Sequence, residues 1–169
     1  DIGTIRSFYE VNLDFAHPHP AFDLFDVEWP IYTRSRFLPG TWVAECDMEQ
    51  ALVAPGCLIY GADVEECVIG LRSSISHKAH LKRVVMMGAD YYETDAQKAE
   101  NARMGLPNIG IGEGSVIEGA ILDKNVRIGR NVVIRNHEGM PEEETESYVV
   151  REGIVVVPKN TTIPDNTVI

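Results

Sequence analysis

Small and aliphatic side chains recur every six residues along most of the chain. The small positions of one stretch are Cys67, Ser73, Ala79 and Val85, and the aliphatic positions two residues later are Ile69, Ile75, Leu81 and Met87. The same interval returns at Ala120, Val126 and Val132 with Leu122, Ile128 and Ile134, and again at Val157, Ile163 and Ile169. A helix needs a period of 3.6 and a regular strand a period of 2. A period of six instead predicts very short strands joined by tight turns.

Glycine and asparagine occupy the positions where such turns are needed. They are Gly110, Gly112, Asn125, Gly129, Asn131, Asn160 and Asn166. Both residue types tolerate the backbone conformations of tight turns. Repeats of this kind resemble those of the left-handed parallel β-helix, a triangular prism with three hexapeptides in each turn, although spacing alone does not fix the handedness. The blocks 43–87, 109–135 and 154–169 are long enough for about five turns of about 18 residues.

The remaining segments predict an all-β domain preceded by a helix and an arm. Residues 1–16 have a helical pattern, with Ile5, Phe8, Tyr9, Leu13 and Ala16 on one face and Thr4 as the N-cap. Residues 17–40 are rich in proline and aromatic side chains, so we expect an extended connecting arm. The β-helix should fill residues 41–169. Two insertions should interrupt it: 88–108, with a short helix from Thr94 to Met104, and 136–152, an acidic solvated loop.

The composition is that of a folded domain with an acidic surface. The chain has 169 residues, 44% of them hydrophobic, and a net charge of −11. This charge repels polyanions, so we expect no nucleic acid as a partner. The sequence has no apolar run of the roughly 18 residues that a membrane span requires, so we expect no membrane association. The three cysteines form no CxxC motif and are expected to be reduced core residues.

Three basic residues, Arg36, Lys124 and Lys159, are candidates for a phosphate site. Both lysines fall at predicted turns between strands. Lysine is a compact point charge that suits phosphoryl oxygens, although a lysine at a turn is more often simply exposed to solvent. The histidines favour a different function, that of an acyltransferase. Acyltransferases built from hexapeptide repeats use one histidine as a general base, and His77, His80 and His137 are the candidates here.

Several longer stretches resemble glucose-1-phosphate adenylyltransferase (ADP-glucose pyrophosphorylase), most closely the plant and cyanobacterial type. The similarity extends over the whole chain in order. Its motifs are DIGTIRSFYEVN at 1–12, PIYT at 30–33, RFLP at 36–39, VIGLRS at 68–73, MMGADYY at 86–92, ILDKNVRIG at 121–129 and GIVVV at 153–157.

The resemblance implies an enzyme that converts ATP and glucose 1-phosphate into ADP-glucose and pyrophosphate for glycogen or starch synthesis. In this family a nucleotidyltransferase domain performs catalysis, and the β-helix supports oligomerisation and allosteric regulation. We expect this chain to hold the β-helix and the last helix of the catalytic domain, and to be inactive alone. A homo- or hetero-tetramer is expected, in the cytoplasm or in a plastid. Asp1 matches one of two aspartates that hold the catalytic Mg²⁺.

The resemblance also assigns roles to the three basic residues. Lys124 and Lys159 match the two C-terminal lysines of the family's activator site, and Arg36 matches an arginine of the arm that helps to bind phosphate-type effectors. The activator of such relatives is 3-phosphoglycerate, and orthophosphate inhibits them. Two alternatives stay open: a stand-alone hexapeptide acyltransferase, and a structural β-helix without a ligand site.

Overall fold

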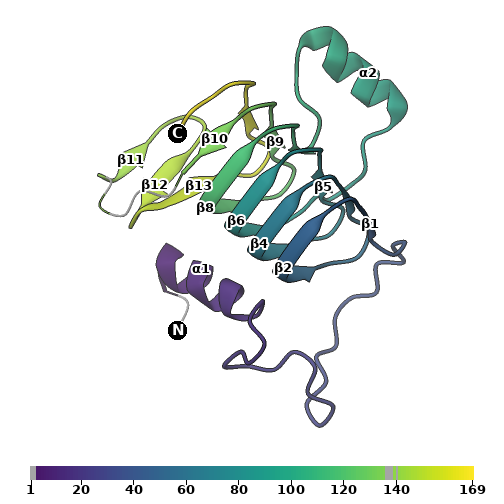
Figure 1. Cartoon of the computed structure of the whole chain (residues 1–169), viewed down its shortest axis with the longest axis vertical. Coiled ribbons are helices and arrows are strands. Elements are labelled where there is room, and N and C mark those ends of the chain that lie inside the picture. The colour runs from purple at the N-terminus through teal and green to yellow at the C-terminus, as the bar shows by residue number, and fades with distance from the viewer. Residues whose placement is uncertain (1–2, 136–138, 140) are drawn as a thin grey trace.

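The computed structural model describes residues 3–135, 139 and 141–169, and it forms a parallel β-helix (Figure 1). One sheet contains six short strands, in the order β1 (Trp42–Ala44), β3 (Leu58–Tyr60), β5 (Ser74–Ile75), β7 (Gly110–Ile111), β9 (Arg127–Ile128) and β14 (Thr162–Ile163). The chain therefore makes five turns and begins a sixth. This confirms the all-β fold that the hexapeptide period predicts.

The second sheet supplies the other two faces of the prism. Its parallel strands are β2 (Asp47–Val53), β4 (Asp63–Ile69), β6 (His80–Met86), β8 (Val116–Leu122) and β13 (Ile154–Val157), and β10 (Val133–Ile134) pairs with the first half of β8. The four seven-residue strands bend in the middle, where the backbone has a positive φ at Gln50, Glu66, Arg83 and Gly119. Each bent strand thus spans two faces.

The bends correct one part of the predicted register. The inward residues on either side of a bend are five residues apart rather than six, as at Leu81 and Met86. A strict period of six would turn Val85 and Met87 inward, and here the structure departs from it: Val84 and Met86 fill the core, Val85 packs against a helix, and Met87 is 38% exposed. With a strict period of six, a separate turn would end the strand at every corner of the prism. In the four bent strands the chain instead passes the corner at a single residue of positive φ, and the strand continues.

The interior of the prism is closely filled with aliphatic side chains. Ile59, Ile117, Ile128 and Ile134 are completely buried, and the inward small residues Cys67, Ala79 and Ala120 lie beside them. Burying one such aliphatic side chain is worth about 1.5–3 kcal/mol before conformational entropy is subtracted. The repeat of small and branched residues is thus the physical basis of the fold.

Asparagine occupies several of the left-handed corners, as predicted. The residues are Asn125, Asn131, Asn160 and Asn166, each with φ between 52° and 62°. Asn125 donates to the side-chain oxygen of Asn160 at 3.0 Å, and Asn131 donates to that of Asn166 at 3.3 Å. Such side-chain bonds link one turn of the helix to the next.

Helix α1 (Ile5–Asp14) packs on the outside of the second sheet. Thr4 is its N-cap and accepts a hydrogen bond from the Ser7 backbone nitrogen. Tyr9 and Leu13 are 3% and 2% exposed and contact outward-facing residues, namely Val85, Ile121 and Ile154. The helix prediction is confirmed, but the helix ends before Ala16. The chain then runs to β1 without helix or strand, and its aromatic side chains are largely exposed, Tyr32 by 92%.

The two insertions leave the prism at different places. The first carries α2 (Asp95–Met104), which lies on the opposite side of the stack from α1 (Figure 1). Thr94 is its N-cap and Gly105 its left-handed C-cap, as predicted. The described part of the second is more ordered than the expected solvated loop, because β12 (Val149–Arg151) extends the second sheet antiparallel to β13, and β11 (Glu143–Glu144) pairs antiparallel to β12. Val150 is fully buried, so this part of the loop contributes to the core.

Candidate anion site and the families that the chain resembles

Lys124 and Lys159 lie together on one carboxylate. The Lys124 Nζ is 3.0 Å from Asp90 Oδ1, and the Lys159 Nζ is 2.7 Å from Asp90 Oδ2, so each oxygen of the carboxylate holds one lysine. The lysine and aspartate side chains are between 37% and 47% exposed. The structure thus unites two of the three predicted basic residues at a position that solvent reaches.

The parallel register explains why the two lysines meet. Lys124 follows β8 and Lys159 follows β13, and the last residues of these strands, Leu122 and Val157, are paired. The Asn160 backbone nitrogen donates to the Lys124 carbonyl at 2.9 Å. The lysines therefore occupy equivalent corners of successive turns, although 35 residues separate them in the sequence.

Asp90 is held in place by its backbone and by Asn125. The Asp90 backbone nitrogen donates to Asn125 Oδ1 at 2.8 Å, and Asn125 Nδ2 donates to Asp90 Oδ2 at 3.2 Å. The hydrogen bonds from Lys159 and then Lys124 hold the pKa of the Asp90 carboxyl well below its ordinary value, and that of Asn125 adds to the effect. Asp90 also raises the pKa of Lys159. Asp90 and Lys159 are therefore charged at neutral pH.

The other predicted site residues are not part of this cluster. Arg36 lies on the exposed arm, and its side chain makes no ion pair with any residue that the structure describes. Asp1 and His137 lie outside the described residues. No group of three or more His, Cys, Asp or Glu side chains within the described ranges could hold a metal ion.

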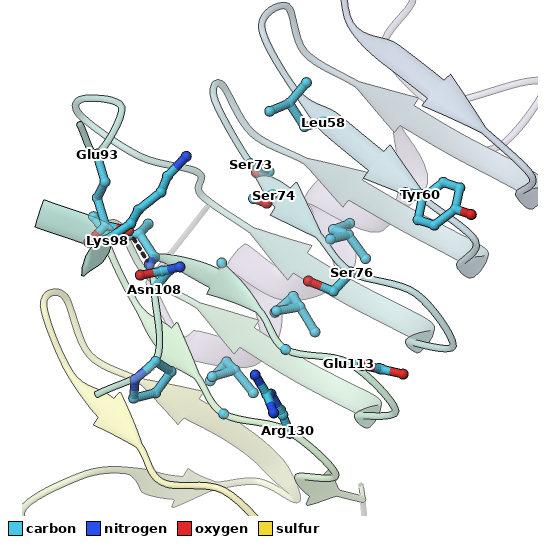
Figure 2. Close-up of a pocket in the computed structure, with 18 of the residues that line it drawn as sticks. Leu58, Tyr60, Ser73, Ser74, Ser76, Glu93, Lys98, Asn108, Glu113 and Arg130 are labelled. Carbon is cyan, nitrogen blue, oxygen red and sulfur yellow. Dashed lines mark hydrogen bonds between the residues drawn. The ribbon is translucent and has the colours of Figure 1, made fainter. Parts of the chain in front are cut away.

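A groove lies between the first sheet and the insertion that carries α2. It encloses about 780 Å³. Figure 2 shows Glu93, Lys98 and Asn108 of the insertion on one side of this groove and Tyr60 and Arg130 on the other. Its lining combines the short side chains Ser73, Ser74 and Ser76 with aromatic ones such as Tyr91 and Tyr92. Neither lysine of the cluster lines the groove.

Glu93 fixes the insertion to the prism. Its side chain is 4% exposed and forms an ion pair with Arg127 Nη1 at 2.7 Å. It also accepts hydrogen bonds from Asn101 Nδ2 at 2.7 Å and from the Ile109 backbone nitrogen at 2.8 Å. Burial raises the pKa of Glu93, but these hydrogen bonds together outweigh burial, so the net pKa is below its ordinary value. The insertion is thus anchored near both of its ends.

The two described candidates for an acyltransferase base, His77 and His80, have different neighbours. His77 stacks on Tyr60 with ring centroids 5.4 Å apart, and His80 Nδ1 lies 2.8 Å from an oxygen of Asp63 on the neighbouring strand. One therefore packs on an aromatic ring and the other pairs with a carboxylate on the sheet surface.

Sequence reasoning did not identify Asp90, Asn125 and Glu93 as site residues. Asp90 was visible only as part of the MMGADYY motif, and Asn125 only as a turn residue. The role of Asp90 follows from the strand register, which places the start of the insertion beside the turns that carry Lys124 and Lys159, later in the chain.

Comparison with known families decides where the chain belongs. The model of the GLGC left-handed parallel beta-helix domain matches residues 36–168. The chain belongs to this family. The match fixes the handedness that the hexapeptide spacing left open. The GLGC β-helix is the C-terminal region of glucose-1-phosphate adenylyltransferase, a nucleotidyltransferase family of glycogen and starch synthesis. The part of this GLGC chain that the structure describes contains no helix long and apolar enough to cross a membrane.

Proposed function

We propose that this β-helix is the regulatory and assembly domain of a glucose-1-phosphate adenylyltransferase, and that Lys124 and Lys159 bind a phosphate-bearing effector. The observation that carries the proposal is the placement of both ammonium groups within 3.0 Å of one carboxylate. A phosphate group offers similarly charged acceptor oxygens, and lysine binds phosphate as a point charge. Two lysines that already share one anionic group can share another.

The proposed effectors are 3-phosphoglycerate and orthophosphate, as in the plant and cyanobacterial enzymes that the chain resembles. Arg36 would join the site from the arm, whose exposed position leaves its guanidinium accessible. Nucleotidyl transfer between ATP and glucose 1-phosphate, with Mg²⁺, belongs in this proposal to a catalytic domain outside the chain. The chain alone should therefore release no pyrophosphate from these substrates.

Assembly into a tetramer is supported by the apolar side chains that the chain leaves in solvent. Trp42, Leu58 and Tyr60 are 53%, 51% and 42% exposed on one face of the first sheet, and Trp29 and Phe37 of the arm are 79% and 95% exposed. Exposed apolar groups that share one face, as Trp42, Leu58 and Tyr60 do, are typical of interaction surfaces.

Calorimetry tests the anion site directly. Titration of 3-phosphoglycerate into the chain should give binding that is weakened at least about tenfold by Lys124→Ala or Lys159→Ala, because each change removes one ammonium from a two-ammonium site. Lys98→Ala is the matched control, since Lys98 is an exposed lysine on α2 that makes no ion pair with Asp90. Equal affinities for all four proteins would refute the proposal.

A further inference from the structure

Asp90 occupies the position that an effector anion would take. Its two oxygens contact the two ammonium groups at 3.0 and 2.7 Å, so neither lysine is free to bind another anion with its full charge. From this geometry we infer that Asp90 is a built-in competitor of the effector, and that an anion binds by displacing this carboxylate from Lys124 and Lys159. The inference rests on the proposed effector site and adds how that site is controlled.

The charges of the site support this inference. Lys124 and Lys159 bring two positive charges, and Asp90 and Asp123 bring two negative ones. Asp123 is close enough to act electrostatically on Lys159, and its carboxylate also accepts a hydrogen bond from the Lys124 backbone nitrogen at 2.6 Å. The cluster is therefore formally neutral, within a chain whose net charge is −11. Such a site attracts an anion weakly until one carboxylate moves away.

The attachment of Asp90 explains how displacement can occur without loss of the fold. Asn125 binds the Asp90 backbone nitrogen, and Ala89 donates its own backbone hydrogen to the Leu71 carbonyl at 2.8 Å. These bonds hold the main chain at this point, whereas the carboxylate is 37% exposed and can turn toward solvent. A tethered carboxylate competes as if it were present at about millimolar concentration or more. A free anion must therefore be present at a comparable concentration, or bind the lysines more tightly than the carboxylate does, in order to displace it.

The test is calorimetric titration of 3-phosphoglycerate and, separately, of inorganic phosphate into the whole chain and its Asp90→Asn variant. Removal of the competing carboxylate leaves both ammonium groups free for the anion, so it should tighten binding of both anions by about tenfold at moderate salt. Asp90→Ala should do the same. Asp47→Asn is the matched control, because it removes the same charge from an exposed position on β2 and should leave the affinity unchanged.

Two outcomes overturn the inference in distinguishable ways. If the wild-type chain binds the anions and Lys124→Ala weakens them, but Asp90→Asn binds no more tightly, then Asp90 is not a competitor and the proposed effector site still stands. If neither the wild type nor Asp90→Asn binds either anion while circular dichroism shows both to be folded, the effector site itself is refuted, and the inference falls with it.

Discussion

The Glu93 anchor yields a sharp prediction about the insertion that carries α2. Replacement of Glu93 by alanine removes the acceptor of three hydrogen-bonding groups and leaves the Arg127 guanidinium, 19% exposed, without its carboxylate. Loss of one partner of a buried pair costs about 3–5 kcal/mol, and the remaining exposure of Arg127 places the expected loss near the lower end, at about 3 kcal/mol. Glu93→Gln retains an acceptor oxygen and should lose less.

Hydrogen exchange measured by NMR is the appropriate assay, because it separates local from global opening. In Glu93→Ala the amides of α2 and of Ile109 should exchange faster, while those of the buried strands β6 and β8 keep their protection. Glu100→Ala is the matched control, since Glu100 forms an exposed ion pair with Arg103 on the same helix. Exchange in Glu93→Ala that equals exchange in Glu100→Ala would refute the anchoring role.

The Glu93 pair also has a defined pH dependence. Its pKa is lowered in the folded chain, so its contribution is fully present above the unfolded carboxyl pKa and is lost as the pH falls through the lower folded pKa. Protection of α2 should therefore decline in acid in the wild type. In Glu93→Gln, the part of this decline that comes from Glu93 should be absent.

Two further predictions concern α1 and the asparagine corners. Burial raises the pKa of Tyr9 to about 12, and its hydroxyl donates to the Arg83 carbonyl at 2.5 Å. The stability that the protonated tyrosine contributes is complete below the unfolded pKa of 10 and is lost as the pH rises toward 12. Denaturant titrations should show this loss as about 2 kcal/mol in the free energy of unfolding. Tyr9→Phe should abolish this alkaline loss, and an unchanged slope would contradict the argument. Asn125→Ala should cost about 1–3 kcal/mol, because it removes bonds to Asp90 and Asn160 and places alanine at φ 60°. Asn125→Gly should restore only the part due to the backbone, and a Gly variant no more stable than the Ala variant would contradict this.

The fold could be predicted from the sequence because the residues that recur along the chain are those that fill the core of the prism. A small and an aliphatic side chain must enter the prism at each hexapeptide, so the spacing that fills the core is visible in the residues themselves. The step of five at the bent strands escaped prediction, since Glu66 and Arg83 are not residue types that indicate a left-handed conformation. The local caps of α2, by contrast, were readable from Thr94 and Gly105.

The candidate site was only partly predictable, for a reason of topology. The resemblance indicated Lys124 and Lys159, and the common register of β8 and β13 brings them together. Asp90, which lies in the first insertion and 34 residues before Lys124, joins them, and no local sequence pattern predicts such a contact. A long-range ion pair of this kind becomes visible only when the strand pairing is known.

The most direct test of the effector site is an NMR titration of the ¹⁵N-labelled chain with 3-phosphoglycerate. The account predicts that the largest shift changes fall on the amides of Asp90, Lys124, Asn125, Lys159 and Asn160, and that they saturate together. Amides of β2 at the far end of the prism should not move (Figure 1). Saturable shifts confined to another surface, or none at all at millimolar ligand, would contradict the account.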